Sequence, residues 1–227
     1  MAVIYLVRHG QASFGGGEYD RLSDLGKRQS QLTGEELATR FDELELLAHG
    51  EMTRQRDTAD ICATAIGSPA TTRVLAGFNE FAHEEIIVRH KPAYRNRAVM
   101  MADLGRTLRP AAAFQKMFEL ALDRWISGDH DDYSESFVDF QARAFAAFEQ
   151  AADGLTGIAV VATSSGAVSA VCAQLLGLGP TGWHDLNRVM VNAGITKVIV
   201  GKRGASLVTV NEHGHLERAG RELLTYR

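Results

Sequence analysis

The sequence has few cysteines: only Cys62 and Cys172 occur among its 227 residues, and they form no CxxC pair. A disulfide framework and a cysteine-based zinc site are therefore not indicated. Both cysteines lie in apolar segments far apart in the sequence. We therefore expect two buried free thiols in a reducing compartment.

The sequence also lacks an apolar run long enough to span a membrane, and residues 2–7 are too short and too uncharged at their flank for a secretory signal. Its net charge of −4 is not the basic excess that binds nucleic acid or an anionic membrane surface. We expect a cytoplasmic protein with neither partner. The sequence carries no signal for an oligomeric state.

What is present is ordinary for a globular protein, with 45% hydrophobic and 23% charged residues. The length suits a single domain over residues 1–227 that contains an inserted subdomain. Helical periodicity without strand patterns runs through residues 82–153, which we expect to be an all-helical insertion capping the sheet. Within it, residues 128–133 are better interpreted as a solvated turn than as a metal loop.

The first stretch that suggests chemistry is residues 4–7, an apolar strand pattern that ends in Arg8, His9 and Gly10. Ligands in open α/β sheets bind at the carboxyl ends of the strands. Glycine lets the backbone turn away and approach a bound anion closely. These residues propose an anion site with His9 as its reactive group, although a core or capping histidine fits this stretch alone equally well.

Two later positions carry charge next to predicted elements. Arg54 lies in the first turn of a helix expected to end near residue 66, where a cation opposes the helix dipole, so an anion partner is favoured over a solvated surface role. Glu80 follows a short strand at 71–75 and is flanked by aromatic residues. It is either a general acid or a solvated loop acid.

Further elements are predicted from periodicity and turn residues. We expect a helix over residues 24–41 with Ser23 as its N-cap and a short strand at 44–48. A strand at 158–163 is expected to enter an apolar helix at 167–176, and residues 195–200 and 206–210 are expected to form an edge hairpin. Residues 11–19 are expected to be a loop near the site, and residues 211–227 a polar surface tail.

Four features occur in the order typical of one known family: the Arg8-His9-Gly10 motif, the Arg54 segment at 50–59, Glu80 before a helical insertion, and the late strand–turn–helix unit. Together they resemble the histidine phosphatase superfamily. This resemblance implies an α/β fold, a three-layer α/β/α sandwich with a mainly parallel sheet, an antiparallel edge and an all-helical insertion. The resemblance to this superfamily, whose fold is called phosphoglycerate-mutase-like, covers nearly the whole chain.

The resemblance implies that His9 attacks phosphorus and forms a phosphohistidine intermediate. Arg8 and Arg54, with the backbone at Gly10, would hold the phosphate, and Glu80 would protonate the leaving oxygen. The expected substrate is a small phosphorylated molecule. Neither a metal nor another cofactor is expected, because the arginines supply the positive charge.

One position departs from the family pattern. The second catalytic histidine normally ends the late strand, and Ser164 occupies that position here. Serine donates one neutral hydrogen bond but brings no positive charge. The chain is therefore predicted to be a phosphatase that is slow or draws charge from its insertion, or alternatively a phospho-ligand-binding protein. Mutase activity is less favoured, because residues 13–17 replace the Trp- and Asn-rich segment of that branch.

A different enzyme class also fits part of the sequence. Ala162-x-Ser164-x-Gly166 resembles the nucleophile elbow of α/β-hydrolases, and Asp185 followed by His213 or His215 has the chain order of a triad. That fold has no use for His9 or Arg54, so a serine esterase is the weaker alternative.

Overall fold

A computed structural model describes residues 1–13 and 20–226, and these residues form a mixed sheet with the strand order β3-β2-β4-β1-β5-β6. The strands are β1 (Ala2–Arg8), β2 (Leu46–His49), β3 (Thr71–Val74), β4 (Ile158–Thr163), β5 (Ile195–Gly201) and β6 (Gly204–Glu212). β1 is parallel to β4, and β2 is parallel to both β4 and β3. β5 runs antiparallel to β1 and β6, which confirms the predicted edge hairpin.

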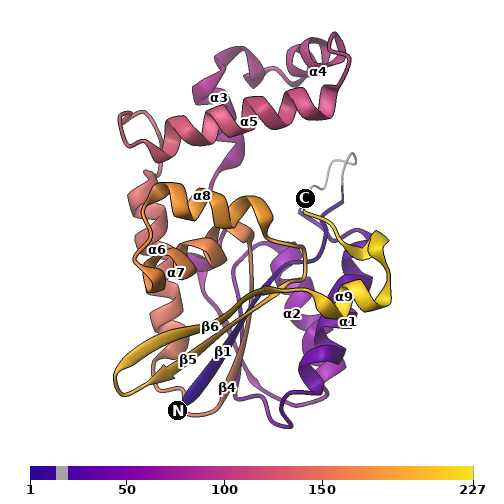
Figure 1. The fold of residues 1–227 in the computed structure, drawn as a ribbon, viewed down its shortest axis with the longest axis vertical. Coiled ribbons are helices and arrows are strands. Elements are labelled where there is room, and N and C mark those ends of the chain that lie inside the picture. The colour runs from indigo at the N-terminus through magenta and orange to yellow at the C-terminus, as the bar shows by residue number, and fades with distance from the viewer. Residues whose placement is uncertain (14–19, 227) are drawn as a thin grey trace. The chain divides into compact units, whose positions relative to one another are not determined.

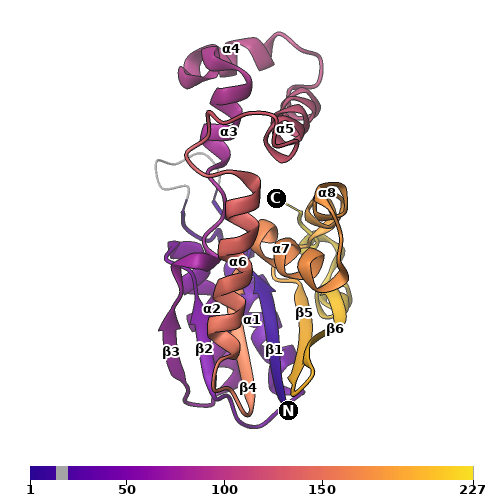
Figure 2. The same cartoon turned by 90° about the vertical axis from the view of Figure 1, so that its left-hand side faces the viewer.

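Helices cover both faces of this sheet (Figure 1, Figure 2). The helices of the described residues are α1 (Asp24–Ala38), α2 (Thr53–Ile66), α3 (His83–His90), α4 (Arg97–Gly105), α5 (Pro110–Ile126), α6 (Phe137–Ala152), α7 (Ser165–Leu176), α8 (Pro180–Val189) and α9 (Gly214–Ala219). α1 and α2 lie on one face, and α7, α8 and the second half of α6 lie on the other. The predicted three-layer α/β/α arrangement is confirmed.

The central strands carry apolar side chains on both faces, as expected for parallel strands between two helical layers. Tyr5 and Val7 of β1 pack in one cluster with Leu37 of α1 and Ala59 of α2. The alternating residue Leu6 is also fully buried. β1 ends at Arg8, where the apolar run of the sequence gives way to polar residues.

Capping residues set the helix boundaries near the site. Ser23 accepts a hydrogen bond of 3.0 Å from the Gly26 amide at the start of α1, as predicted. α1 ends at Ala38, earlier than the predicted residue 41, and Thr39 is its C-cap. α2 ends at Ile66, as predicted, and its C-cap Gly67 has a φ of 73°, the left-handed conformation that glycine adopts most easily.

The chain divides into two compact units, one comprising Met1–Glu80 with Arg143–Arg227 and the other comprising Phe81–Ala142. Within the second unit, aromatic rings of Phe81, Trp125, Phe137 and Phe140 contact one another, with centroids 5.1 to 5.6 Å apart. α6 runs through the boundary between the units. A cap formed by residues 82–153 stays a prediction.

The prediction of a polar surface tail over residues 211–227 is wrong. β6 extends to Glu212, and α9 follows, with Leu216 fully buried against Val191 and Ala193. Gln29 of α1 donates a hydrogen bond of 2.7 Å to the Leu223 carbonyl. The few apolar residues of this segment are spaced too irregularly to signal burial, and only contact with α1 and the 191–193 turn buries them.

Helix α8 was not predicted either. Trp183 on α8 is fully buried, and its indole nitrogen donates a hydrogen bond of 3.0 Å to the Gly166 carbonyl. Both cysteines are buried and free, as predicted, and burial raises the pKa of each thiol to about 12. In the described part of the chain, no helix has the length and apolar character needed to cross a membrane.

Candidate active site

His9 directly follows β1, at the carboxyl edge shared by the parallel strands. Its amide donates a hydrogen bond of 2.7 Å to the Thr163 carbonyl at the end of β4. Its own carbonyl accepts one of 3.1 Å from the Asn192 side chain. The residue is only 7% exposed. The backbone of His9 is therefore fixed between neighbouring chain segments, and the imidazole is largely shielded from water.

The hydrogen bonds of the imidazole define its tautomer. Nδ1 lies 2.7 Å from the Gly10 carbonyl, which can only accept, so Nδ1 carries the proton. Nε2 then holds the lone pair, and Arg54 Nε donates to it over 3.1 Å. Burial, followed by the positive charges of Arg54 and Arg8, holds the pKa of His9 well below its usual value of 6.5. His9 is therefore a neutral imidazole at neutral pH, with its lone pair on Nε2.

Arg54 lies in the first turn of α2 and is 4% exposed, so its interpretation as a solvated surface charge is wrong. Its Nη1 pairs with Asp20 Oδ1 at 2.8 Å. Asp20 Oδ2 accepts a hydrogen bond of 2.7 Å from the Thr53 amide. The Asp20 carboxylate thus lies where a helix N-terminus and an arginine favour an anion. Arg56, by contrast, is exposed and pairs with Asp57.

Arg8 extends from the end of β1 toward two backbone carbonyls. Its Nη1 donates to the carbonyl of Met190 and, over 2.8 Å, to that of Tyr226. Its charge is close enough to His9 to lower the pKa of the imidazole. These contacts position the guanidinium beside His9, while direct phosphate binding by Arg8 stays a prediction.

Gly10 is required by the close approach of α1. A Cβ at this position would lie 2.2 Å from the Gly26 carbonyl oxygen. The Gly10 amide donates to Thr58 Oγ1 on α2 at 3.1 Å. Gly10 therefore lets the chain after His9 pass between α1 and α2, a packing reason that the tripeptide motif did not reveal.

Glu80 and Ser164 both lie at the N-terminus of α7, where Ser164 is the N-cap residue. Glu80 Oε2 accepts hydrogen bonds from the Gly166 amide at 3.3 Å and from Ser165 Oγ at 3.4 Å. Ser164 is fully buried, and its Oγ accepts a hydrogen bond of 2.8 Å from Gln55 Nε2. Of the two interpretations of Glu80, a freely solvated loop acid is therefore not what the structure shows.

The structure places the predicted site residues in the unit built on the sheet and joins His9 directly to Arg54. Sequence reasoning missed Asp20 and Gln55. The only available signals were their positions, one just after the glycine-rich loop and one next to Arg54. Most of that loop, including Gly15, Gly16 and Gly17, lies outside the described residues. Among residues 1–13 and 20–226, no cluster of histidine, cysteine or acidic side chains suits a metal ion.

The alternative serine triad is not assembled. His215 Nε2 lies 2.9 Å from Thr33 Oγ1, and His213 Nδ1 contacts the Asn211 carbonyl. In the described part of the chain, the one hydrogen bond of the Ser164 hydroxyl is with Gln55. No histidine is thus in place to take a proton from Ser164, which removes the geometric basis for a serine esterase.

A neutral histidine lies at the carboxyl end of a central parallel strand, and an arginine donates to its Nε2. This fold and site define an α/β protein suited to binding an anion beside an imidazole. The family model of the histidine phosphatase superfamily (branch 1) matches residues 4–213, so the chain belongs to this superfamily.

Solved structures share the fold at low sequence identity. A mutant phosphoserine phosphatase from Entamoeba histolytica, in complex with phosphoserine, is 16% identical with a TM-score of 0.64, over 95% of this chain and 100% of that chain. A mycobacterial glucosyl-3-phosphoglycerate phosphatase with inorganic phosphate is 21% identical with a TM-score of 0.61, over 94% and 98%. A putative alpha-ribazole-5'-P phosphatase from Escherichia coli is 18% identical with a TM-score of 0.62, over 93% and 96%. A search of curated proteins finds no match.

Proposed function

We propose that this protein is a phosphatase that hydrolyses phosphomonoesters through a phosphohistidine on His9 Nε2. The observation that carries the proposal is the neutral His9 imidazole, whose Nε2 lone pair faces the Arg54 guanidinium at 3.1 Å. A nucleophile for phosphoryl transfer needs an available lone pair next to positive charge that stabilises the phosphoryl oxygens. Membership of the histidine phosphatase superfamily supports this assignment.

In the first step, a phosphate group enters beside His9 and the Arg54 guanidinium transfers its hydrogen bond from Nε2 to a phosphoryl oxygen. The Nε2 lone pair attacks phosphorus, and the ester P–O bond breaks with its electron pair on the leaving oxygen. Glu80, held at the start of α7, gives that oxygen a proton. The Nδ1–H bond to the Gly10 carbonyl stabilises the positive imidazole that results.

In the second step, water attacks the phosphohistidine. A new P–O bond forms as the P–N bond breaks, and the Glu80 carboxylate takes the proton from the water molecule. Inorganic phosphate leaves, and His9 returns to its neutral form. Arg8 and the Ser164 hydroxyl complete the phosphate contacts in this proposal. Small phosphorylated metabolites are the substrate class to examine, since structural neighbours contain phosphoserine and 3-phosphoglycerate.

The test is phosphate release from an aryl phosphate, with trapping of the phosphorylated protein. We expect turnover by the wild type, an acid-labile and base-stable phosphoryl adduct, and loss of both in His9→Ala. Turnover that survives in His9→Ala, or an adduct at another residue, would contradict the phosphohistidine mechanism.

A phospho-ligand-binding protein with weak or no catalysis is the second candidate, and the fully buried neutral Ser164 favours it. Removing one preorganised donor costs about 10²–10³ in rate in enzymes where this has been measured. Tight binding of inorganic phosphate by a wild type that neither turns over nor forms an adduct would support binding and exclude the phosphatase.

We also propose a cytoplasmic location. The two buried free thiols Cys62 and Cys172 fit a reducing compartment.

A further inference from the structure

Gln55, for which the sequence predicted no role, is fully buried in the first turn of α2. Its Nε2 donates two hydrogen bonds, one of 2.9 Å to the Phe78 carbonyl and one of 2.8 Å to Ser164 Oγ. A backbone carbonyl can only accept, so the amide orientation of Gln55 is determined by Phe78. Its second N–H is thereby directed at Ser164.

The other side of Gln55 has no polar contact. Oε1 is buried and has no hydrogen-bond partner among the described residues. Gly50 provides the space for it, because a Cβ at position 50 would lie 2.1 Å from Oε1. A buried carbonyl oxygen without a partner is unfavourable, and such groups in native proteins call for an explanation. The amide is thus held in this orientation despite that cost.

Ser164 is the N-cap residue of α7, yet its side chain makes no capping hydrogen bond. Serine at this position normally accepts from the first amides of the helix. Here the Gly166 amide donates to Glu80 instead, and Ser164 Oγ accepts from Gln55. Since Gln55 donates a hydrogen bond to Ser164 Oγ, the hydroxyl hydrogen of Ser164 remains available to donate to another acceptor.

The strand register places Ser164 beside His9. Arg8 pairs with Thr163 across β1 and β4, and the His9 amide bonds to the Thr163 carbonyl at 2.7 Å. The residue that directly follows β1 is His9, and the residue that directly follows β4 is Ser164. A hydroxyl donor at this place serves an anion bound at His9.

We propose that Gln55 is a positioning residue that makes the Ser164 hydroxyl a hydrogen-bond donor to the phosphoryl group at His9. This inference rests on the phosphate site proposed above. Gln55 touches neither substrate nor His9 in this role and acts only through Ser164. The pair provides a preorganised neutral donor at the strand end where positive charge is missing.

The test is a double-mutant cycle with Gln55→Leu and Ser164→Ala, read out by inhibition with orthovanadate, kcat and KM. Leucine keeps the size of the side chain but cannot donate. We expect Ser164→Ala to weaken vanadate binding and kcat by about 100-fold. Gln55→Leu should lower both by about five- to tenfold, the contribution of one neutral hydrogen bond, with KM changed less than kcat. The double variant should match Ser164→Ala.

Thr163→Val is the matched control, because Thr163 Oγ1 donates to the same Phe78 carbonyl at 2.7 Å without reaching Ser164. Its effect should add to that of Ser164→Ala. If Gln55→Leu adds in the same way, or leaves vanadate binding unchanged, Gln55 does not act through Ser164 and the inference is overturned.

The two proposals fail separately in this experiment. A wild type that binds vanadate without hydrolysing phosphate esters, and that shows the non-additive pattern, contradicts the phosphatase while supporting the role of Gln55. A wild type that hydrolyses esters, with Gln55→Leu indistinguishable from it, contradicts the role of Gln55 alone. Absence of vanadate binding to the wild type overturns both.

Discussion

At the scale of single residues, the chemistry of His9 depends on its surroundings more than on its type. A histidine in water titrates near pH 6.5, at the edge of the physiological range. Burial and two nearby arginines hold the pKa of His9 well below that value, and the Gly10 carbonyl fixes the proton on Nδ1. The same imidazole on the surface would be partly protonated and without a fixed tautomer.

We expect Arg54→Gln to raise the pKa of His9 toward 6.5, because removal of a nearby positive charge makes the imidazolium less unfavourable. Titration of the imidazole followed by ¹⁵N NMR measures this. The control is Arg56→Gln, which removes an exposed arginine of the same helix that pairs with Asp57. Equal titration in the two variants would mean that Arg54 does not set the pKa of His9.

At the scale of elements, the start of α2 combines a helix N-terminus with Arg54, and Asp20 already supplies an anion to both. A phosphate ion bound to Arg54 has to compete with this carboxylate or accept its repulsion. The Asp20 side chain is 45% exposed, so water screens the pair and its contribution is modest.

Asp20→Asn should therefore bind inorganic phosphate about two- to fivefold more tightly, since the amide oxygen can still accept from Thr53 but carries no charge. Isothermal titration calorimetry at low and high salt measures the difference, which should shrink as salt rises. Asp24→Asn, at the exposed start of α1, is the control. Weaker phosphate binding by Asp20→Asn would indicate that the carboxylate mainly orients Arg54.

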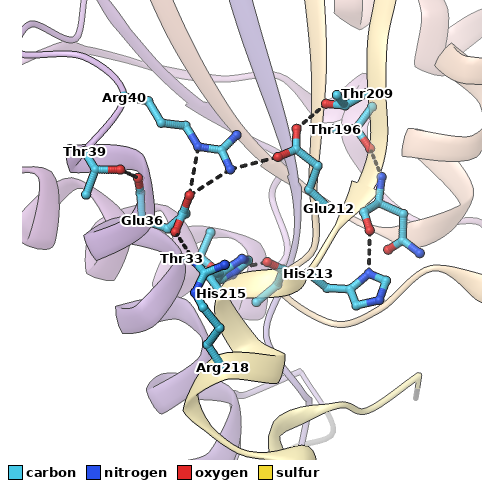
Figure 3. Close-up of polar contacts among 12 residues, drawn as sticks. Thr33, Glu36, Thr39, Arg40, Thr196, Thr209, Glu212, His213, His215 and Arg218 are labelled. Atoms are coloured by element: carbon cyan, nitrogen blue, oxygen red, sulfur yellow. Dashed lines mark hydrogen bonds and ion pairs between the residues drawn. The ribbon is translucent and has the colours of Figure 1, made fainter.

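Helix α9 is joined to α1 by a polar cluster (Figure 3). Arg40 pairs with Glu36 and Glu212, and Arg218 also pairs with Glu36. Thr33 Oγ1 uses its only proton on the Ala193 carbonyl, so His215 Nε2 donates to it. Burial lowers the pKa of His215 to about 4.

This pKa makes the stability of the fold depend on pH. Below pH 6.5 His215 is mostly protonated in the unfolded chain. In the folded chain it stays mostly neutral until the pH falls to about 4. The contribution of neutral His215 to the free energy of unfolding is therefore fully present above pH 6.5, and it is lost as the pH decreases from 6.5 to about 4. The loss due to His215 amounts to about 2 kcal/mol at pH 5.

His215→Gln keeps a donor to Thr33 but does not titrate. Between pH 7 and pH 5 we expect the wild type to lose about 2 kcal/mol more unfolding free energy than this variant. Urea denaturation at each pH measures it, and the other titrating groups cancel because both proteins share them. Parallel pH profiles would mean that His215 is protonated equally well in the folded state.

At the scale of the whole molecule, each of the two compact units contains one of the two tryptophans. Trp125 belongs to the aromatic cluster of Phe81–Ala142, and Trp183 to the unit built on the sheet. α6 has Phe140 in one unit and Phe148 in the other, both fully buried. Because helices are cooperative, opening either unit leaves half of α6 without packing.

We therefore expect the units to unfold together. Trp125→Phe leaves Trp183 as the fluorescence reporter, and Trp183→Phe leaves Trp125. In urea, fluorescence and circular dichroism of each variant should give coincident transitions. A separate early transition reported by Trp125 alone would show that the 81–142 unit unfolds independently.

Local patterns were sufficient for much of the fold. The apolar runs of β1 and β4, the Ser23 cap and the limits of α2 follow from the side chains of each segment and their immediate neighbours. Helix α8 and the buried tail were missed, since Trp183 and Leu216 are buried by contacts with residues far away in the sequence.

The sequence by itself determined the chemical groups of this protein: a histidine and an arginine at the end of an apolar strand, an arginine at a helix start, and a serine directly after the late strand. Only the tertiary structure decided their states. The neutral His9, the pairing of Arg54 with Asp20 and the hydrogen bond from Gln55 to Ser164 depend on distances between segments. Burial and hydrogen bonding act through space, so a one-dimensional pattern names the groups but leaves their protonation and orientation to the fold.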